Sequence, residues 1–133
     1  MEDFTKIAAN ALKKDKGFIG NNNYEVVKVE KNYCELDGNI TETSLNNLGM
    51  AHGGYIFGLA DTAAGIAAMT NGGNVVTLDS TINYIKPAKG SRITAKAKPI
   101  KTGKTISVYE VEIIDENEEI ISKATITFYN IEK

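Results

Sequence analysis

Residues that could do chemistry gather in one short stretch that is otherwise nearly all apolar or glycine. They are Asn46, His52, Gly53, Asp61 and Thr62. Asp61 is the only Lys, Arg, Asp or Glu between Thr43 and Leu78. A carboxylate in apolar surroundings is costly unless it is paired or used. The pattern therefore predicts a functional acid, able to act as a nucleophile or as a general base toward water.

Two glycines follow His52, the single histidine of the chain, and we expect them to open a helix. Glycines allow the backbone to approach a ligand closely, and the first N–H groups of a helix have no partner within it. The N–H groups of Gly53 and Gly54 are thus candidates for holding a developing oxyanion.

The spacing of Gly53 and Asp61 constrains how they can cooperate. They are eight residues apart, which is about 12 Å along a helix. One carbonyl group cannot touch both in the same chain. If both act on it, Asp61 must come from a second copy related by a two-fold axis. The spacing then predicts a homodimer with two shared sites.

The scaffold expected around these residues is one buried helix and an antiparallel sheet. The helix is predicted over 54–70 and is ended by the Asn-Gly-Gly-Asn segment at 71–74. Its small residues should let it lie close against the strands: Gly58, Ala63, Ala64, Gly65, Ala67 and Ala68. A further short helix is expected over 3–14.

Strand-like segments make up most of the remaining chain. A pair is predicted within 24–38, turning near 30–32. Four more are expected in a meander, at 75–88, 91–100, 105–114 and 121–131. An antiparallel sheet needs cover on its apolar face. We therefore predict an α+β fold in which five or six strands wrap around one long central helix.

Composition narrows the class of protein. The 133 residues suit a single domain, 1–133, with 42% hydrophobic residues, 24% charged residues and a net charge of −2. That balance does not favour a nucleic-acid partner. The lone Cys34 and the lack of a secretory segment favour the cytoplasm. The apolar run is long enough to span a membrane, but its polar residues and glycines favour a buried helix, so we expect no membrane partner.

Two segments carry a family resemblance: "NNLGMAHGGYIFGLADTAAGIA" at 46–67 and "VTLDSTINYIKPAKG" at 76–90. They resemble the hotdog-fold acyl-CoA thioesterases of the phenylacetate-degradation (PaaI) type. That family's pattern runs Asn, Gly, His-Gly-Gly, a helix with the catalytic acid, then a strand that ends in an aromatic followed by Pro-Ala. The match is densest over 46–90, and the strand order extends it across about 24–130.

The resemblance implies a role for each matching residue. Asp61 matches the catalytic carboxylate, and Gly53 matches the residue whose N–H polarises the thioester carbonyl. Asn46 matches a loop amide near that carbonyl, with a slip to the next asparagine as an alternative. His52 matches a histidine that holds this corner, and Thr77 matches a Ser or Thr that orients the water. The acid acts on a thioester held by the partner subunit, in a homodimer that commonly pairs into a tetramer.

The expected reaction is hydrolysis of a small aryl or medium-chain acyl-CoA, with no cofactor because a thioester is already activated. Gly54 and Tyr55 are further candidates for substrate binding, and Tyr55, Ile56, Leu59 and Met69 for the acyl pocket. Basic residues could meet the coenzyme A phosphates as point charges. They are Lys86, Lys89, Arg92, Lys101 and Lys104.

Other interpretations stay open. One is a non-catalytic acyl-CoA-binding module, and another is a hotdog enoyl-CoA hydratase or dehydratase. A nucleophilic pair of Cys34 and His52 is disfavoured because nothing in the sequence places them together. The Lys-Thr-Gly-Lys-Thr segment at 101–105 lacks the glycine at 98 and the following helix that a phosphate-binding loop needs. No spacing of His and Cys predicts a metal site.

Overall fold

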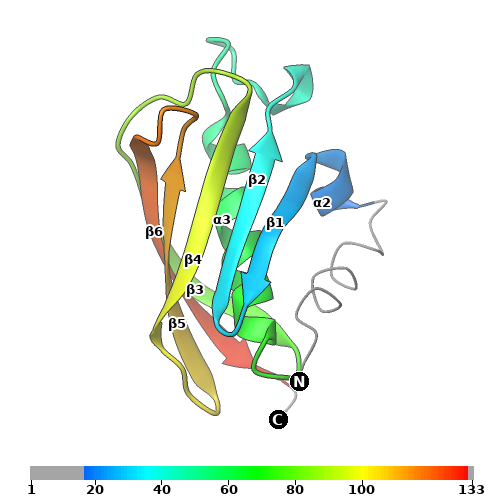
Figure 1. Ribbon diagram of the computed structural model, residues 1–133, viewed down its shortest axis with the longest axis vertical. Coiled ribbons are helices and arrows are strands. Elements are labelled where there is room, and N and C mark those ends of the chain that lie inside the picture. The colour runs from blue at the N-terminus through cyan, green and yellow to red at the C-terminus, as the bar shows by residue number, and fades with distance from the viewer. Residues whose placement is uncertain (1–16, 132–133) are drawn as a thin grey trace.

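A computed structural model describes residues 17–131, which form a six-stranded antiparallel sheet with one long helix against it. The elements are α2 (Phe18–Asn21), β1 (Tyr24–Glu30), β2 (Tyr33–Asn39), the 3₁₀ turn η1 (Glu42–Ser44), α3 (Gly53–Met69), β3 (Val75–Tyr84), β4 (Arg92–Lys101), β5 (Ile106–Ile114) and β6 (Ile120–Asn130). Figure 1 shows the sheet curving in front of α3. This is the predicted hotdog fold. The helix expected over 3–14 lies outside the described residues.

The central helix begins one residue earlier than predicted and ends at Met69. His52 is its N-cap, and Gly72 and Gly73 have positive φ angles that stop the chain from continuing as a helix. Ten of its seventeen residues are buried. An apolar helix with so little exposed surface is stable only because the concave face of the sheet surrounds it.

Most of the small helix residues pack as expected. Ala63, Ala64, Ala67 and Ala68 are buried against the strands. Gly65 is an exception, because a methyl group placed on it would lie 3.9 Å from the nearest atom, in the ring of Phe128. That distance is an ordinary van der Waals contact, so a methyl group would fit and close packing does not require glycine at this position.

Alternation in the strands directs their apolar side chains toward the helix. In β4, Ile93, Ala95 and Ala97 are fully buried, while the residues between them are partly exposed. Strands β5 and β6 show the same alternation. The two-residue period read from the sequence is confirmed, and it places the hydrophobic core between the sheet and α3.

The strand order corrects one prediction. The sheet runs β1-β2-β4-β5-β6-β3, so β4, β5 and β6 form a meander but β3 does not join it. The chain leaves α3 at the far edge of the sheet, where β3 pairs with β6. Local sequence patterns identify strands but not which distant strand each one pairs with, so the meander of four was wrong.

The edge strand β3 has two unusual features. Its register with β6 shifts between Thr77 and Asp79, so that Leu78 is an extra residue in the strand. Its free edge also carries exposed apolar side chains, with Val76 47% and Leu78 60% exposed. An exposed apolar edge of this length is a surface that proteins normally cover.

Candidate active site

Asp61 lies half-buried in the middle of α3, on the side that faces β3. The hydroxyl of Thr77 donates a hydrogen bond of 2.6 Å to its Oδ1. No lysine or arginine among the described residues forms an ion pair with it. The structure thus brings together the predicted acid and the predicted threonine. It leaves the carboxylate with a hydroxyl as partner instead of a cation.

The Asp61 pocket, a cavity of about 340 Å³, opens beside this carboxylate. Thr62, Gly65, Ile66 and Met69 of α3 line it together with Asp61. The other lining residues are Ile19, Val75, Thr77 and Phe128. Apart from the acid and two threonines the lining is apolar, as in many small-molecule sites.

The first turn of α3 carries the second half of the site. His52 caps the helix, because its Nδ1 accepts a 2.8 Å hydrogen bond from the N–H of Gly54. Because Nδ1 accepts this hydrogen bond, the proton of the neutral imidazole ring is on Nε2. The N–H of Gly54 is therefore already used. Within residues 17–131, the N–H of Gly53 has no acceptor, which narrows the predicted oxyanion cradle from two glycines to one.

Tyr84 is a site residue to which the sequence reasoning assigned no role. Its hydroxyl donates a 2.9 Å hydrogen bond to the carbonyl oxygen of Gly53. Its ring lies 3.3 Å from the position of a methyl group placed on Gly53. Burial of the phenol raises the pKa of Tyr84, so it remains a donor at neutral pH. The sequence feature that could have identified Tyr84 is an aromatic residue at the end of a strand, two positions before Lys86-Pro87-Ala88.

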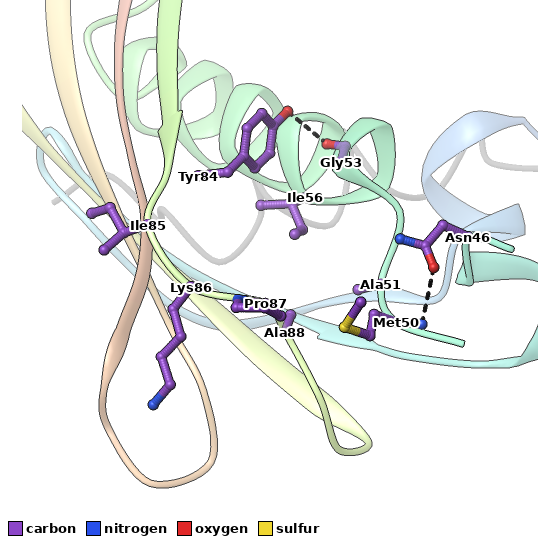
Figure 2. Close-up of a pocket in the computed structure, with 10 residues that line it drawn as sticks. All are labelled: Asn46, Met50, Ala51, Gly53, Ile56, Tyr84, Ile85, Lys86, Pro87 and Ala88. Atoms are coloured by element: carbon purple, nitrogen blue, oxygen red, sulfur yellow. Dashed lines mark hydrogen bonds between the residues drawn. The ribbon is translucent and has the colours of Figure 1, made fainter. Parts of the chain in front are cut away.

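Asn46 is held by its own loop. Its Oδ1 accepts hydrogen bonds from the N–H groups of Leu48, at 2.9 Å, and Met50, at 3.1 Å. With the oxygen fixed, the amide nitrogen points into the cavity, as Figure 2 shows. Asn46 is thus set up to donate to a ligand. The alternative slip to the exposed Asn47 is not supported, because Asn46 lines the cavity and Asn47 does not.

The Gly53 pocket, which contains Gly53 and Asn46, measures about 310 Å³. Met50, Ala51, Ile56 and Tyr84 also line it (Figure 2). Its rim is the segment that follows β3, residues 85–88. Ile56 is the one predicted acyl-pocket residue that it contains.

The two pockets share no lining residue. Gly53 and Asp61 belong to one continuous helix, which holds them about 12 Å apart along its axis. Within one chain, the candidate oxyanion donors and the candidate acid therefore face different cavities. The geometry matches the separation predicted from the sequence.

Two predicted substrate-binding residues lie elsewhere. Tyr55 is buried in the core, where its hydroxyl donates to the carbonyl oxygens of Asn22, at 2.9 Å, and Asn39, at 3.2 Å. Leu59 is likewise fully buried and lines neither cavity. Both are framework residues in this structure, because the face of α3 that carries them packs against the sheet.

The basic residues are dispersed. Lys86 lies on the rim of the Gly53 pocket and pairs with Glu119, which raises the pKa of its ammonium group. Lys89 is exposed in the following loop, and Arg92 lies near Asp37 at 3.9 Å. Lys101 is the last residue of β4, a ten-residue strand that begins at Arg92, so about 30 Å of strand separates the two. Lys104 lies three residues further along the chain. One chain therefore does not bring the five together at a single phosphate site.

Cys34 is fully buried in β2 and faces the core. Burial, with a smaller contribution from Glu35, raises the pKa of its thiol to about 12. It is inert as a nucleophile at neutral pH. His52 is exposed at the start of α3, so the pairing of Cys34 with His52 is excluded.

Over residues 17–131, no helix has both the length and the apolar character needed to cross a bilayer.

Comparison with known proteins identifies what the fold resembles. Residues 48–122 match the model of a family described as the thioesterase superfamily. The acyl-coenzyme A thioesterase PaaI of Escherichia coli K12 is 28% identical over 99 residues, which are 74% of this chain and 71% of that protein. The solved structure of E. coli PaaI superposes with a TM-score of 0.92 at 23% identity, covering 97% of this chain and 94% of that one.

A hypothetical thioesterase protein of Streptococcus pneumoniae TIGR4, solved with coenzyme A, has a TM-score of 0.79 at 34% identity. The superposition covers 84% of this chain and 90% of the S. pneumoniae chain. The same protein has been solved with an aspartate replaced by alanine and with a threonine replaced by alanine. Those two positions have the same separation in sequence as Asp61 and Thr77.

Proposed function

Because this chain belongs to the thioesterase superfamily and is a thioester hydrolase, we propose that it converts a small aryl or medium-chain acyl-CoA into the free acid and coenzyme A. The substrate needs no further activation, so the proposed reaction uses water and no cofactor. The proposed catalytic groups are the carboxylate of Asp61, the N–H of Gly53 and the side-chain amide of Asn46.

The observation that carries this proposal is the Asp61–Thr77 pair at the mouth of an apolar cavity. A carboxylate without a cationic partner stays available to take a proton or to attack a carbonyl carbon. The hydrogen bond from Thr77 occupies Oδ1 and fixes the plane of the carboxylate. Oδ2, which receives no hydrogen bond from the described residues, is then directed at the reacting atoms.

The chemistry follows from these groups. Water attacks the thioester carbon as Asp61 takes its proton, or Asp61 attacks first and water cleaves the resulting anhydride. In both routes the carbonyl oxygen gains negative charge, which the N–H of Gly53 and the amide of Asn46 stabilise. The C–S bond then breaks and the coenzyme A thiolate leaves. In the first route the thiolate takes up the proton held by Asp61. In the second route this step yields the anhydride, and the water that cleaves it supplies the proton.

The proposed site is shared between two copies of the chain, because Asp61 and Gly53 of one copy face different pockets. The edge strand β3 supports a dimer. The Asp61 pocket includes Val75 and Thr77 from the beginning of β3, whereas the Gly53 pocket includes Tyr84 from its end. Two β3 strands paired antiparallel across a two-fold axis bring the beginning of one next to the end of the other.

This pairing has two consequences. It places Asp61 of one copy beside the partner subunit's Gly53, as the chemistry requires. It also covers the exposed apolar side chains of β3 and satisfies its free backbone groups. A tetramer formed from two such dimers, located in the cytoplasm, completes the proposal.

The test is the release of free thiol from a panel of acyl-CoA esters by the wild type and by Asp61→Asn. The asparagine keeps the shape of the side chain and can still accept from Thr77. We expect a loss of at least about a hundredfold in turnover, because the base or nucleophile is removed. Glu30→Gln is the matched control, since it makes the same chemical change at an exposed carboxylate in β1.

Equal rates for the wild type and Asp61→Asn would remove Asp61 from the mechanism. Binding of acyl-CoA without cleavage of any ester would indicate a binding module. Hydration of an enoyl-CoA would indicate a hydratase.

A further inference from the structure

The Asp61 pocket extends along α3 toward the C-terminal end of the helix. Gly65 and Met69 follow Asp61 at intervals of four residues, so the three lie on one face of the helix, and all of them line the cavity. Their spacing spans about 12 Å of helix. The pocket is therefore longer than the carboxylate alone requires.

The walls of this extension are apolar. Ile66 and Val75 contribute aliphatic surface, and Phe128 contributes an aromatic ring. Phe128 is 2% exposed, and its ring meets that of Tyr109 edge-to-face at 6.1 Å between centroids. The ring of Phe128 is thus a fixed wall of the cavity.

Gly65 lines the pocket without contributing a side chain to it. A Cβ at this position would lie 3.9 and 4.0 Å from the nearest atoms of the Phe128 ring, in ordinary van der Waals contact, so there is room for a methyl group between the helix and that ring. Its φ angle is not in the left-handed region, so the helical backbone does not require glycine there. The structure gives the glycine no role in packing or backbone conformation. What it does provide is room next to the acid.

The geometry of a thioester decides which part of a substrate takes that room. Besides its oxygen, the carbonyl carbon of a thioester is bonded to only two groups, the sulfur of coenzyme A and the first carbon of the acyl chain. The coenzyme A arm is polar at its far end and must leave toward solvent. In the proposed dimer, the pocket at the partner subunit's Gly53, which has a lysine on its rim, offers that exit. The acyl group is left with the apolar extension beside Asp61.

We propose that Gly65 and Met69 select the acyl group. Gly65 admits a ring or a chain alongside Asp61, and Met69 closes the far end of the pocket. This inference rests on the proposed function. The volume indicates the size class: an apolar cavity of about 150 Å³ holds benzene, and this one measures about 340 Å³. Acyl groups of the size of phenylacetyl or octanoyl fit it, whereas acetyl leaves most of it empty.

The test compares kcat/KM for phenylacetyl-CoA, octanoyl-CoA and acetyl-CoA in the wild type and in Gly65→Leu. We expect the variant to lose at least about tenfold for the two larger esters and to stay within about threefold for acetyl-CoA. Leucine has a higher helix propensity than glycine, so the variant is expected to fold. Circular dichroism and the melting temperature check that it does.

Two further variants sharpen the test. Met69→Ala lengthens the pocket and should shift the preference toward acyl groups longer than octanoyl. Thr125→Leu adds a comparable apolar group at an exposed position of β6, outside both pockets, and should leave the ratio of the esters unchanged.

The outcomes separate this inference from the proposed function. A wild type that cleaves none of the esters refutes the proposed function. A wild type that cleaves them, with a ratio that Gly65→Leu does not change, refutes the selection by Gly65 and leaves the function intact. An equal loss on all three esters in a folded Gly65→Leu has the same meaning.

Discussion

The proposed role of the Gly53 N–H can be tested by removing that one donor. Gly53→Pro does so, since proline has no backbone N–H. Gly53 is the first residue of α3, and its N–H accordingly has no acceptor within the helix. The substitution therefore deletes the candidate oxyanion donor without breaking a helical hydrogen bond.

The local backbone is suited to this change. Proline is favoured at the first position of a helix. The residue before a proline must be extended, and His52 already is, with φ −63° and ψ 140°. The capping bond from the Gly54 N–H to His52 is untouched. We therefore expect a folded protein with a melting temperature close to that of the wild type.

The expected magnitude follows from the number of donors left. Loss of one oxyanion donor typically costs about 10² to 10³ in kcat. The Asn46 amide still points into the same pocket, which favours the lower end of that range. We predict a loss of about a hundredfold, equivalent to about 2.7 kcal/mol in the barrier.

The control is Gly53→Ala, which keeps the N–H but adds the same Cβ, 3.3 Å from the Tyr84 ring. Any loss in the alanine variant measures the steric disturbance of Tyr84. The further loss in the proline variant measures the contribution of the N–H to kcat. Steady-state thiol release by both variants, with circular dichroism to confirm the fold, gives the two terms. Equal kcat values for the two variants would refute the assignment of Gly53 as an oxyanion donor.

Further predictions concern the shared site and the helix cap. Co-expressed Asp61→Asn and Gly53→Pro chains should recover about a quarter of the wild-type activity, because half of the randomly assorted dimers are mixed and each has one intact site; activity no higher than that of the separate variants contradicts sharing. His52→Ala should lose about 1 kcal/mol of folding stability through loss of the N-cap, measured by urea denaturation, and His52→Ser should restore it. A stable His52→Ser protein without activity would instead assign His52 a chemical role.

Much of the fold could be predicted because its signals are local. The alternation in 91–100 and the breaker at 71–74 each depend on neighbouring residues, and the structure agrees with both. The position of β3 in the sheet could not be predicted in this way, because the pairing between β3 and β6 joins residues 38 to 55 positions apart. Nothing in the composition of β3 distinguishes an edge strand with exposed apolar residues from a buried one.

Part of the candidate site could also be predicted. Asp61 was conspicuous because it is isolated among apolar residues, and its spacing from Gly53 indicated that one carbonyl group could not touch both in the same chain. The hydrogen bond that occupies the Gly54 N–H was not predictable, because it depends on the rotamer of His52. The role of Gly65 was missed for a related reason, since a glycine that packs closely and one that borders a cavity look the same in sequence.

The extra residue in β3 determines which way both halves of the site point. Along a regular strand, Thr77 and Tyr84, seven positions apart, would project to opposite faces. Leu78 changes the parity, so that Thr77 lies opposite Phe128, and Tyr84 lies opposite Ser122, both of which face inward from β6. A single inserted residue thus allows one strand to support the acid at its beginning and the Gly53 carbonyl at its end. A chain of this fold that lost the insertion would keep its core but turn one of these two supports outward.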